Sequence, residues 1–331
     1  MKFGIFSVVD HYPKELPRTS GQFYAELLEQ VEAAEEWGFE SFWVAEHHFH
    51  EYGGIPRPPI WLGAAAQRTK RIRLGAAVVV LPFDNPLRAA EDYAMVDILS
   101  NGRLDLGTGS GYLKHEFDGF GVPPEEKRAR FDEALEVFLR AWTGERFSYE
   151  GKYYRFKDIQ LNVVPLQRPR PPVWIAILRN EAAPFVGRKG FPIMMIPYAT
   201  TEHFSELTET VGAFREAFLS GGGRHDAATV SFGLHTYCAE SFEEARAQAR
   251  EAMDRYVRTR LYAKQRPFEL LVEKALIAFG SPEDVLAVAR RYEAAGLTHF
   301  LAITNFGGLE HKKVLRSMEL LAREVLPAFR R

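Results

Sequence analysis

Short runs of β-branched and other apolar residues alternate with longer amphipathic stretches along nearly the whole chain. The runs predict strands over residues 3–9, 40–46, 72–81, 103–108, 172–177, 191–196, 229–238 and 298–303. Apolar residues spaced three and four apart predict helices over 22–37, 58–69, 86–100, 125–142, 181–189, 202–219, 241–260, 282–295 and 311–329. This alternation is typical of an α/β protein, and eight strands fit a closed (β/α)8 barrel of the TIM type. An open doubly wound sheet shares much of the same local pattern.

Two segments interrupt the alternation of strands and helices. Residues 145–171 contain a hairpin-like sequence at 149–154 and then three prolines, with a fourth, Pro172, directly after the segment, and we expect them to form an insertion after the fourth helix. Residues 261–280 precede the helix expected at 282–295 and are a candidate lid near the barrel mouth. A chain of 331 residues with 46% hydrophobic residues can bury one large core, so we expect a single domain over 1–331.

The composition excludes several classes of partner. A formal net charge of −2 leaves no basic excess to neutralise a run of phosphates, so we expect no nucleic acid partner. No stretch reaches the ~20 apolar residues of a membrane span, and the first residues read as a strand and lack the features of a signal peptide. One cysteine, Cys238, excludes an internal disulfide, and we interpret it as a small buried residue in a strand. We therefore expect a cytoplasmic protein.

The densest group of titratable residues follows the second predicted strand, over residues 46–54. The catalytic residues of barrel enzymes lie at the carboxyl ends of the strands, and a histidine there can act as a general base. In an extended segment His47 lies on the opposite face from Glu46 and His48. The alternative is that these histidines are structural, bonded to the backbone or to Glu46. The pair His48 and His50 also resembles a zinc-binding pattern, but no histidine follows the fifth or sixth strand, so we expect no metal site.

Small residues mark two further strand ends. Glycine recurs at every second position in 107–111, and residues 74–82 of the third strand are also rich in small side chains. Such positions permit either close strand packing or the approach of a flat ligand to the backbone. The spacing is GxGxG, which does not match a dinucleotide fingerprint.

At these residues the chain resembles the bacterial luciferase-like flavin monooxygenase family, and the resemblance runs over nearly the whole length. The motifs that carry it are Lys2-Phe3-Gly4, Trp43 to Phe49, Gly75 to Pro82, Asn85 to Asp92, Ser100 to Gly107, and Ser317 to Pro327.

The resemblance implies a cofactor, a reaction and several residue roles. Reduced FMN, supplied by a separate flavin reductase, would react with O₂ to give a flavin hydroperoxide that oxygenates a small apolar substrate. His47 matches the family's catalytic base, and Ala77 and Val78 match a non-prolyl cis peptide behind the flavin ring. The family also implies a homodimer formed through the helices at 58–69 and 86–100.

The chain departs from the family where the flavin phosphate is bound. Ser110, between Gly109 and Gly111, replaces an arginine found in luciferase. A serine cannot form the bidentate, charge-assisted hydrogen bonds that an arginine makes to a phosphate. We expect Arg179, after the fifth strand, to supply the charge, with Asn180 capping the next helix. The substrate pocket should exclude water, and the aromatic candidates to line it are Phe6, Trp43, Tyr112 and Tyr198.

Two other functions fit the same resemblance. One is an oxidoreductase that uses F420 or FMN to transfer a hydride without activating oxygen. The other, from a different class, is a flavin-binding barrel that has no catalytic activity.

Overall fold

The computed structural model describes residues 1–260 and 264–330, and within them eight parallel strands form a closed barrel. The barrel strands, in ring order, are β1 (Lys2–Ser7), β2 (Ser41–Val44), β3 (Arg73–Val80), β4 (Leu104–Gly109), β7 (Val173–Ala176), β8 (Ile193–Met195), β9 (Val230–Cys238) and β11 (His299–Asn305). The ring closes because β8 pairs with β9, β9 with β11, and β11 with β1. The predicted barrel is confirmed, and the open sheet is excluded.

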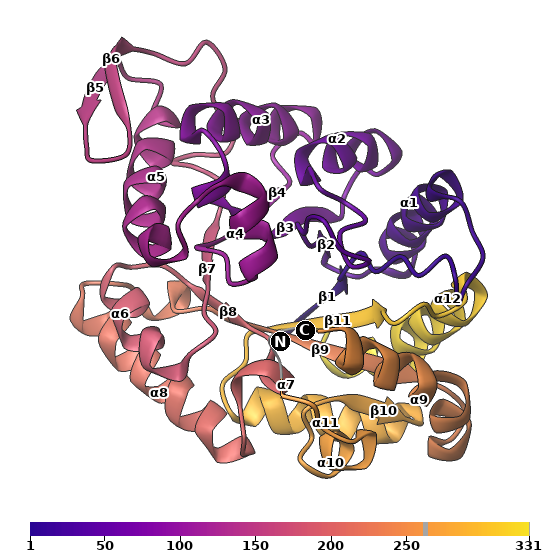
Figure 1. Ribbon diagram of the computed structural model, residues 1–331. Coiled ribbons are helices and arrows are strands. Elements are labelled where there is room, and N and C mark those ends of the chain that lie inside the picture. The colour runs from indigo at the N-terminus through magenta and orange to yellow at the C-terminus, as the bar shows by residue number, and fades with distance from the viewer. Residues whose placement is uncertain (261–263, 331) are drawn as a thin grey trace.

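The helices are α1 (Ser20–Trp37), α2 (Pro58–Arg68), α3 (Pro86–Leu99), α4 (Lys114–Phe120), α5 (Lys127–Ala141), α6 (Ala183–Arg188), α7 (Pro197–Thr200), α8 (Phe204–Ser220), α9 (Phe242–Thr259), α10 (Phe268–Glu273), α11 (Pro282–Ala294) and α12 (His311–Leu320). Most of them surround the barrel on its outside, whereas α4 lies across one end of the ring (Figure 1). Short helical turns are η1 (Leu81–Phe83), η2 (Pro124–Glu126), η3 (Asn180–Ala182), η4 (His225–Ala227), η5 (Leu321–Val325) and η6 (Leu326–Ala328). Among the described residues, no helix combines the length and apolar character that crossing a membrane requires.

Several helices differ from their predicted bounds. The predicted helices at 125–142 and 181–189 begin as the turns η2 and η3, and that at 202–219 begins only at Phe204. The last predicted helix ends at Leu320 and continues as a π turn and a 3-10 turn. Helices α4, α7 and α10 were not predicted, because each is shorter than eight residues and buries only two of them.

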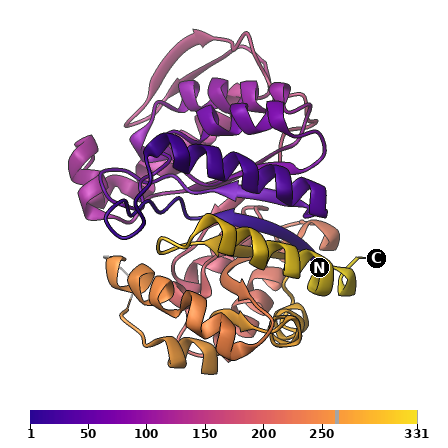
Figure 2. The same ribbon diagram turned by 90° about the vertical axis from the view of Figure 1, so that its right-hand side faces the viewer.

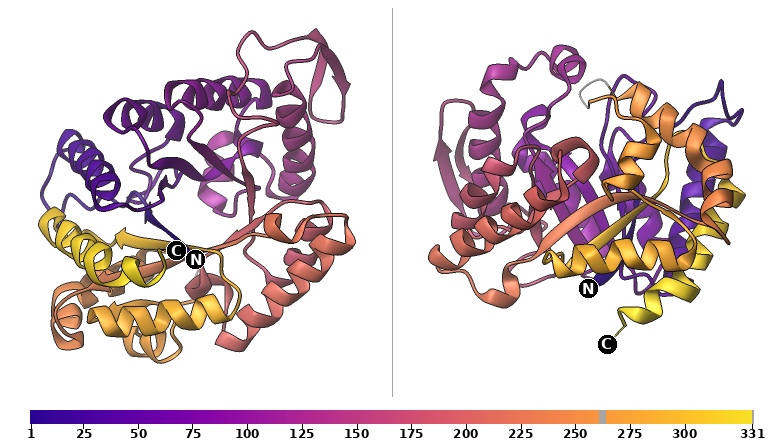
Figure 3. Two further views of the ribbon diagram at one scale, coloured as in Figure 1. Left: turned by 180° about the vertical axis from the view of Figure 1, so that it is seen from behind. Right: turned by 90° about the horizontal axis from the view of Figure 1, so that it is seen from below.

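The segment 145–171 lies outside the barrel. Its strands β5 (Phe147–Glu150) and β6 (Arg155–Ile159) pair antiparallel and stand beside α5 (Figure 3). Of the candidate lid at 261–280, residues 261–263 lie outside the described residues. The rest includes α10 and β10 (Ala278–Gly280), which pairs with β9 outside the ring. The role of this segment as a lid stays a prediction.

The barrel has two distinct ends. Helix α4 and the chain that leads into α5 lie at one end, and both termini lie at the other (Figure 2). Strands in the ring are buried on both faces, and all nine residues of β9 are buried. This explains why the strands appear in the sequence as continuous apolar runs. Cys238, at the end of β9, is buried and unpaired.

Candidate active site

A cavity of about 570 Å³ opens at the carboxyl ends of the barrel strands. This volume lies within the range of about 300–1,000 Å³ that is usual for small-molecule sites. Apolar side chains from β1, β3, β7, β8 and β11 form most of its wall. The lining residues are Phe6, Glu46, His47, Ala77, Val78, Val80, Gly109, Ser110, Gly111, Tyr112, Glu116, Lys127, Arg128, Ile175, Ala176, Ile177, Leu178, Arg179, Ala182, Met194, Met195, Ile196, Ser231, Gly233 and Leu301.

His47 and Glu116 form a hydrogen-bonded pair in this lining. His47 follows β2, and its Nδ1 lies 3.0 Å from Oε1 of Glu116 in α4. The same oxygen accepts the backbone N–H of His48 at 2.9 Å. The Glu116 side chain is 1% exposed and that of His47 is 12% exposed. On the other side of the ring, Nε2 of His47 lies 3.3 Å from the hydroxyl of Tyr112.

This arrangement sets the protonation of the imidazole ring. Burial lowers the pKa of His47 below its usual range, and the hydrogen bond and negative charge of Glu116 offset part of that shift. The ring is therefore neutral at pH 7. Since Glu116 accepts at Nδ1, the ring proton is on Nδ1 and Nε2 is left as the acceptor. A neutral histidine held in this way can receive a proton.

The other residues of the histidine cluster have structural partners. Nε2 of His48 lies 3.2 Å from Oε1 of Glu46, so these two side chains share a face as the alternation predicts. Burial raises the pKa of Glu46, although its contacts with His48 counteract this. The ring of His50 packs against Tyr52 with centroids 4.2 Å apart. Across residues 1–260 and 264–330, no three His, Cys, Asp or Glu side chains are arranged to hold a metal ion.

The small residues of β3 and β4 form one wall of the cavity. The Ala77–Val78 peptide bond is cis, and the pairing of β3 with β4 shifts register between Ala76 and Val79. A Cβ atom on Gly109 would lie 2.8 Å from Cγ2 of Val78. Gly107 is absent from the lining, and a Cβ there would lie 2.6 Å from the carbonyl of Ala76. Both glycines therefore permit close packing of β3 against β4, and Gly109 does so at the cavity wall.

Three of the predicted site residues do not line the cavity. Trp43 is 2% exposed, and its Nε1 donates to Ser41 Oγ at 2.9 Å inside the barrel. Tyr198 is fully buried against the rings of His235 and Tyr256.

The third is Asn180, for which the prediction of a helix cap is wrong. The residue in the N-cap position of η3 is Arg179, no side chain caps that turn, and Asn180 is the first residue within it. The reason is that η3 begins one residue earlier than the predicted helix. The remaining predicted residues, His47, Ala77, Val78, Gly109, Ser110, Gly111, Arg179, Phe6 and Tyr112, all line the cavity.

Sequence reasoning missed Glu116, Lys127 and Arg128, which also line the cavity. Glu116 lies in α4, which is too short to show a helical period in the sequence. It is distant from His47 along the chain, and the two side chains meet only because the chain folds. Lys127 and Arg128 open α5 and have the ordinary appearance of charged residues on a solvated helix. What sets Glu116 apart is its burial, and the sequence does not distinguish a buried acid from an exposed one.

A closed (β/α)8 barrel with a mainly apolar cavity and a histidine–carboxylate pair at its mouth defines a barrel enzyme. The chain matches the family model described as luciferase-like monooxygenase over residues 1–299, and it belongs to that family.

Known members of the family differ in cofactor. The fold is similar to the crystal structure of monooxygenase RslO1 from Streptomyces bottropensis, with 32% identity, a TM-score of 0.92 and 100% of both chains covered. The oxygenase component of the flavin-dependent trigonelline monooxygenase of Acinetobacter baylyi is 27% identical, over 99% of this chain and 96% of that protein. An F420-dependent glucose-6-phosphate dehydrogenase of Amycolatopsis mediterranei is 29% identical, over 92% and 94%. The family thus includes flavin-dependent monooxygenases and F420-dependent oxidoreductases.

Proposed function

We propose that this protein is the oxygenase component of a two-component, FMN-dependent monooxygenase that acts on a small apolar substrate. The observation that carries the proposal is the neutral His47, held by Glu116 at the edge of a mainly apolar cavity. The similarity to the trigonelline oxygenase component supports the same assignment. A flavin reductase and O₂ are the further partners that this reaction requires.

The residues of the cavity fit a flavin. Gly109 carries no Cβ, and one placed there would come within 2.8 Å of Cγ2 of Val78, so the glycine lets Val78 pack closely against β4 where both residues line the cavity. Ala77, Val78 and Ala176 offer small apolar side chains beside it. When bound, reduced FMN supplies the electron pair with which O₂ is activated.

The chain's own residues bind and orient the reacting groups and exclude water from them. Phe6, Ile175 and Leu301 form apolar wall that keeps water from the reacting atoms. Glu116 holds Nδ1–H of His47, so Nε2 receives a proton from the reacting groups and can return it. The hydroxyl of Tyr112, 3.3 Å from Nε2, orients that nitrogen or passes the proton on.

Hydride transfer to or from F420 is the second candidate function. It is favoured by the similarity to an F420-dependent dehydrogenase over nearly the whole chain. In that reaction His47 would exchange a proton with a substrate hydroxyl while the hydride moves to or from the cofactor. The geometry of the His47 and Glu116 pair serves either reaction.

The test is oxygen-dependent turnover of a panel of small apolar compounds with FMN, NADH and a flavin reductase, using ¹⁸O₂. We expect one ¹⁸O atom in the product and a loss of at least about 100-fold in product formation by His47→Ala, with FMN binding retained. Turnover with F420 in the absence of O₂ would favour the second candidate. Free peroxide as the only product with every compound would favour a flavin-binding barrel without catalytic activity.

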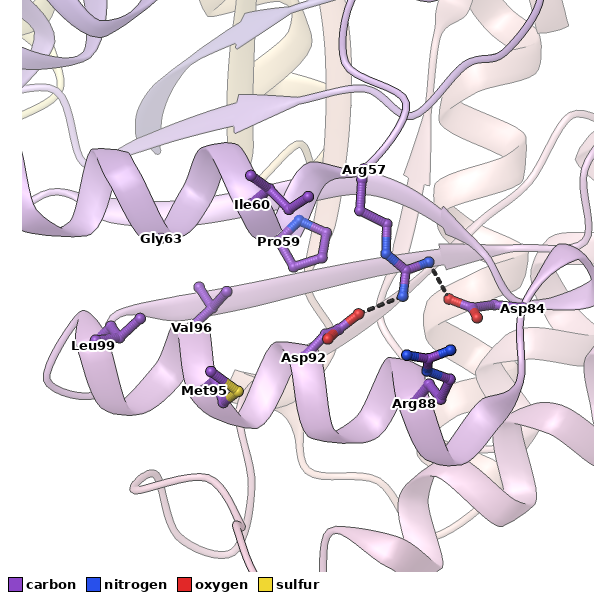
Figure 4. A pocket seen from close by; sticks show the side chains of 10 residues that line it. All are labelled: Arg57, Pro59, Ile60, Gly63, Asp84, Arg88, Asp92, Met95, Val96 and Leu99. Carbon is purple, nitrogen blue, oxygen red and sulfur yellow. Dashed lines mark hydrogen bonds and ion pairs between the residues drawn. The ribbon is translucent and has the colours of Figure 1, made fainter.

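We further propose that the protein is a homodimer that uses the outer face of α2 and α3. A groove between these helices contains the ion pairs of Arg57 with Asp84 and Asp92 (Figure 4). Ile60, which is 75% exposed, and Met95, which is 52% exposed, also line this groove. Large apolar side chains exposed together at this level are typical of a protein interface.

A further inference from the structure

Strand β9 presents alternate residues to the inside of the barrel. Ser231 and Gly233 both line the cavity. A Cβ atom placed on Gly233 would lie 3.3 Å from Cδ1 of Phe6, another lining residue, so position 233 faces inward. The ring of Phe232 packs outward against Tyr292 of α11, with centroids 5.9 Å apart. Since successive side chains of a strand point to opposite faces, the side chain of Ser231 faces inward too.

Ser231 is the polar side chain in an otherwise apolar half of the cavity wall. Strands β8, β9, β11 and β1 are neighbours in the ring and form this half. The charged lining residues belong to the other half, where they follow β2 and β7 or lie in α4 and α5. The lining residues that the four strands supply are Phe6, Met194, Met195, Ser231, Gly233 and Leu301.

The hydroxyl of Ser231 lacks a hydrogen-bond partner. Its Oγ is buried and bonds to no group within residues 1–260 and 264–330. The residue is 1% exposed, so bulk solvent does not satisfy the hydroxyl either. A buried hydroxyl without a partner destabilises a fold, whereas an alanine at the same position would not, and buried polar groups are nearly always hydrogen-bonded. A ligand held in the cavity can supply the partner that Ser231 lacks.

Strand β9 faces the wall of the cavity that carries the cis peptide bond. In the ring of eight strands, β9 lies four strands from β3 in either direction, so the two face each other across the cavity. Ala77 and Val78 of β3 line the opposite wall. The proposed function assigns the β3 and β4 wall to the flavin ring, which leaves the β9 side for the substrate.

We propose that the substrate binds on the β9 side and that Ser231 forms a hydrogen bond to an oxygen atom of it, an assignment that rests on the proposed function. The substrate class is then a small, mainly apolar compound that carries a carbonyl or hydroxyl oxygen. The Ser231 hydroxyl donates to a carbonyl oxygen and can also accept from a hydroxyl group. Gly233, which has no side chain, leaves room for the apolar body of the substrate beside Phe6 and Leu301.

The test uses three six-membered rings of similar size, cyclohexanone, cyclohexanol and methylcyclohexane. Isothermal titration calorimetry measures their binding to the wild type, Ser231→Ala and Gly233→Ala, each alone and saturated with FMN. The matched control is Thr236→Val, which removes a hydroxyl from the outer face of the same strand, where Oγ1 donates to the carbonyl of Leu234 at 2.8 Å. The quantity compared is the ratio of affinities between variant and wild type for one ligand, because the cost of removing that ligand from water cancels in this ratio.

We expect Ser231→Ala to weaken the binding of cyclohexanone and cyclohexanol about tenfold and to leave that of methylcyclohexane unchanged. Gly233→Ala should weaken all three ligands alike, because the added methyl group occupies cavity space that they share. Thr236→Val should change none of the affinities.

The assignment would be overturned if Ser231→Ala weakened all three ligands alike or none of them, or if the wild type bound neither oxygen-containing ring. Binding that depends on Ser231, combined with no ¹⁸O-labelled product from any oxygen-containing compound, would contradict the proposed function alone. Labelled product from compounds whose binding is the same in the wild type and in Ser231→Ala would contradict the role of Ser231 alone.

Discussion

At the scale of single residues, the position of His47 depends on Glu116. One carboxylate oxygen accepts both the ring N–H of His47 and the backbone N–H of His48, so it fixes the ring and the chain that carries it. The histidine could be predicted from sequence, because it stands in a distinctive run after a strand. Glu116 could not, since the two residues lie 69 positions apart and only the packing of α4 brings them together.

The first prediction concerns the charge of Glu116. Its hydrogen bond and negative charge raise the pKa of His47, so Glu116→Gln should lower that pKa further. Because the neutral ring is the active form, the acid limb of the kcat/KM profile should move to lower pH, while kcat falls as the ring loses its orientation. Glu125→Gln, at an exposed position before α5, is the matched control. An unchanged acid limb in Glu116→Gln would contradict the pairing.

The second prediction concerns His299, at the start of β11. Burial lowers its pKa to about 4, while the unfolded chain titrates near 6.5. As pH falls below about 6.5 the unfolded chain takes up a proton and the folded chain does not, so stability is lost until about pH 4. The free energy of unfolding should fall by up to about 3 kcal/mol from this residue over that interval.

Urea denaturation of the wild type and of His299→Gln, repeated across this pH range, measures the contribution of His299. Other buried groups affect both proteins equally, so the difference in slope isolates this residue. We expect a shallower pH dependence in His299→Gln. Parallel curves for the two proteins would show that His299 is not held neutral in the fold.

At the scale of elements, a strand or helix could be predicted from the sequence when it is long and buries many of its residues. Strands such as β9, buried at every residue, and long helices such as α9, with its capping Ser241, give strong patterns. Helix α4 buries only Glu116 and Phe117, which is too little for an apolar period. The element that carries the carboxylate partner of His47 is therefore one that the sequence pattern does not reveal.

The third prediction concerns the outer face of α2 and α3. If these helices pair with a second copy, Ile60→Asp places a charge in an apolar contact and should convert a dimer into a monomer. Size-exclusion chromatography with light scattering gives the mass directly. The control is Leu219→Asp, on α8, where the side chain is 41% exposed on a different part of the barrel. A monomeric wild type, or a variant that stays dimeric, would contradict the proposed interface.

At the scale of the whole molecule, the eight strands could be predicted from local pattern, whereas the prediction of a closed ring rested on their number and on the family resemblance. Local periodicity is the same for a barrel and for an open sheet, and only the pairing of β8 with β9 and of β11 with β1 distinguishes them. The closure of the barrel also explains how the residues of the site come together. Residues after β2, β4 and β7 meet at one mouth because the ring returns each strand end to the same face.

Closure and the outside position of the hairpin lead to the last prediction, a circular permutant. Both ends of the chain lie at the face opposite the cavity, where the rings of Phe3 and Phe329 are 4.9 Å apart (Figure 2). Joining them with a Gly/Ser linker and opening the chain between Gly151 and Lys152 leaves every barrel pairing intact.

The permutant should fold and bind FMN as the wild type does. Opening the hairpin removes the β5–β6 connection, and the Lys152 and Tyr153 backbone contacts with Glu133 that anchor it become weaker. We therefore expect a modest loss of stability and no loss of flavin affinity, measured by denaturation and fluorescence quenching. The contrasting permutant opens between Gly111 and Tyr112, inside the cavity lining, and should lose flavin binding. Loss of binding in the hairpin permutant would mean that the insertion supports the cavity from outside the ring.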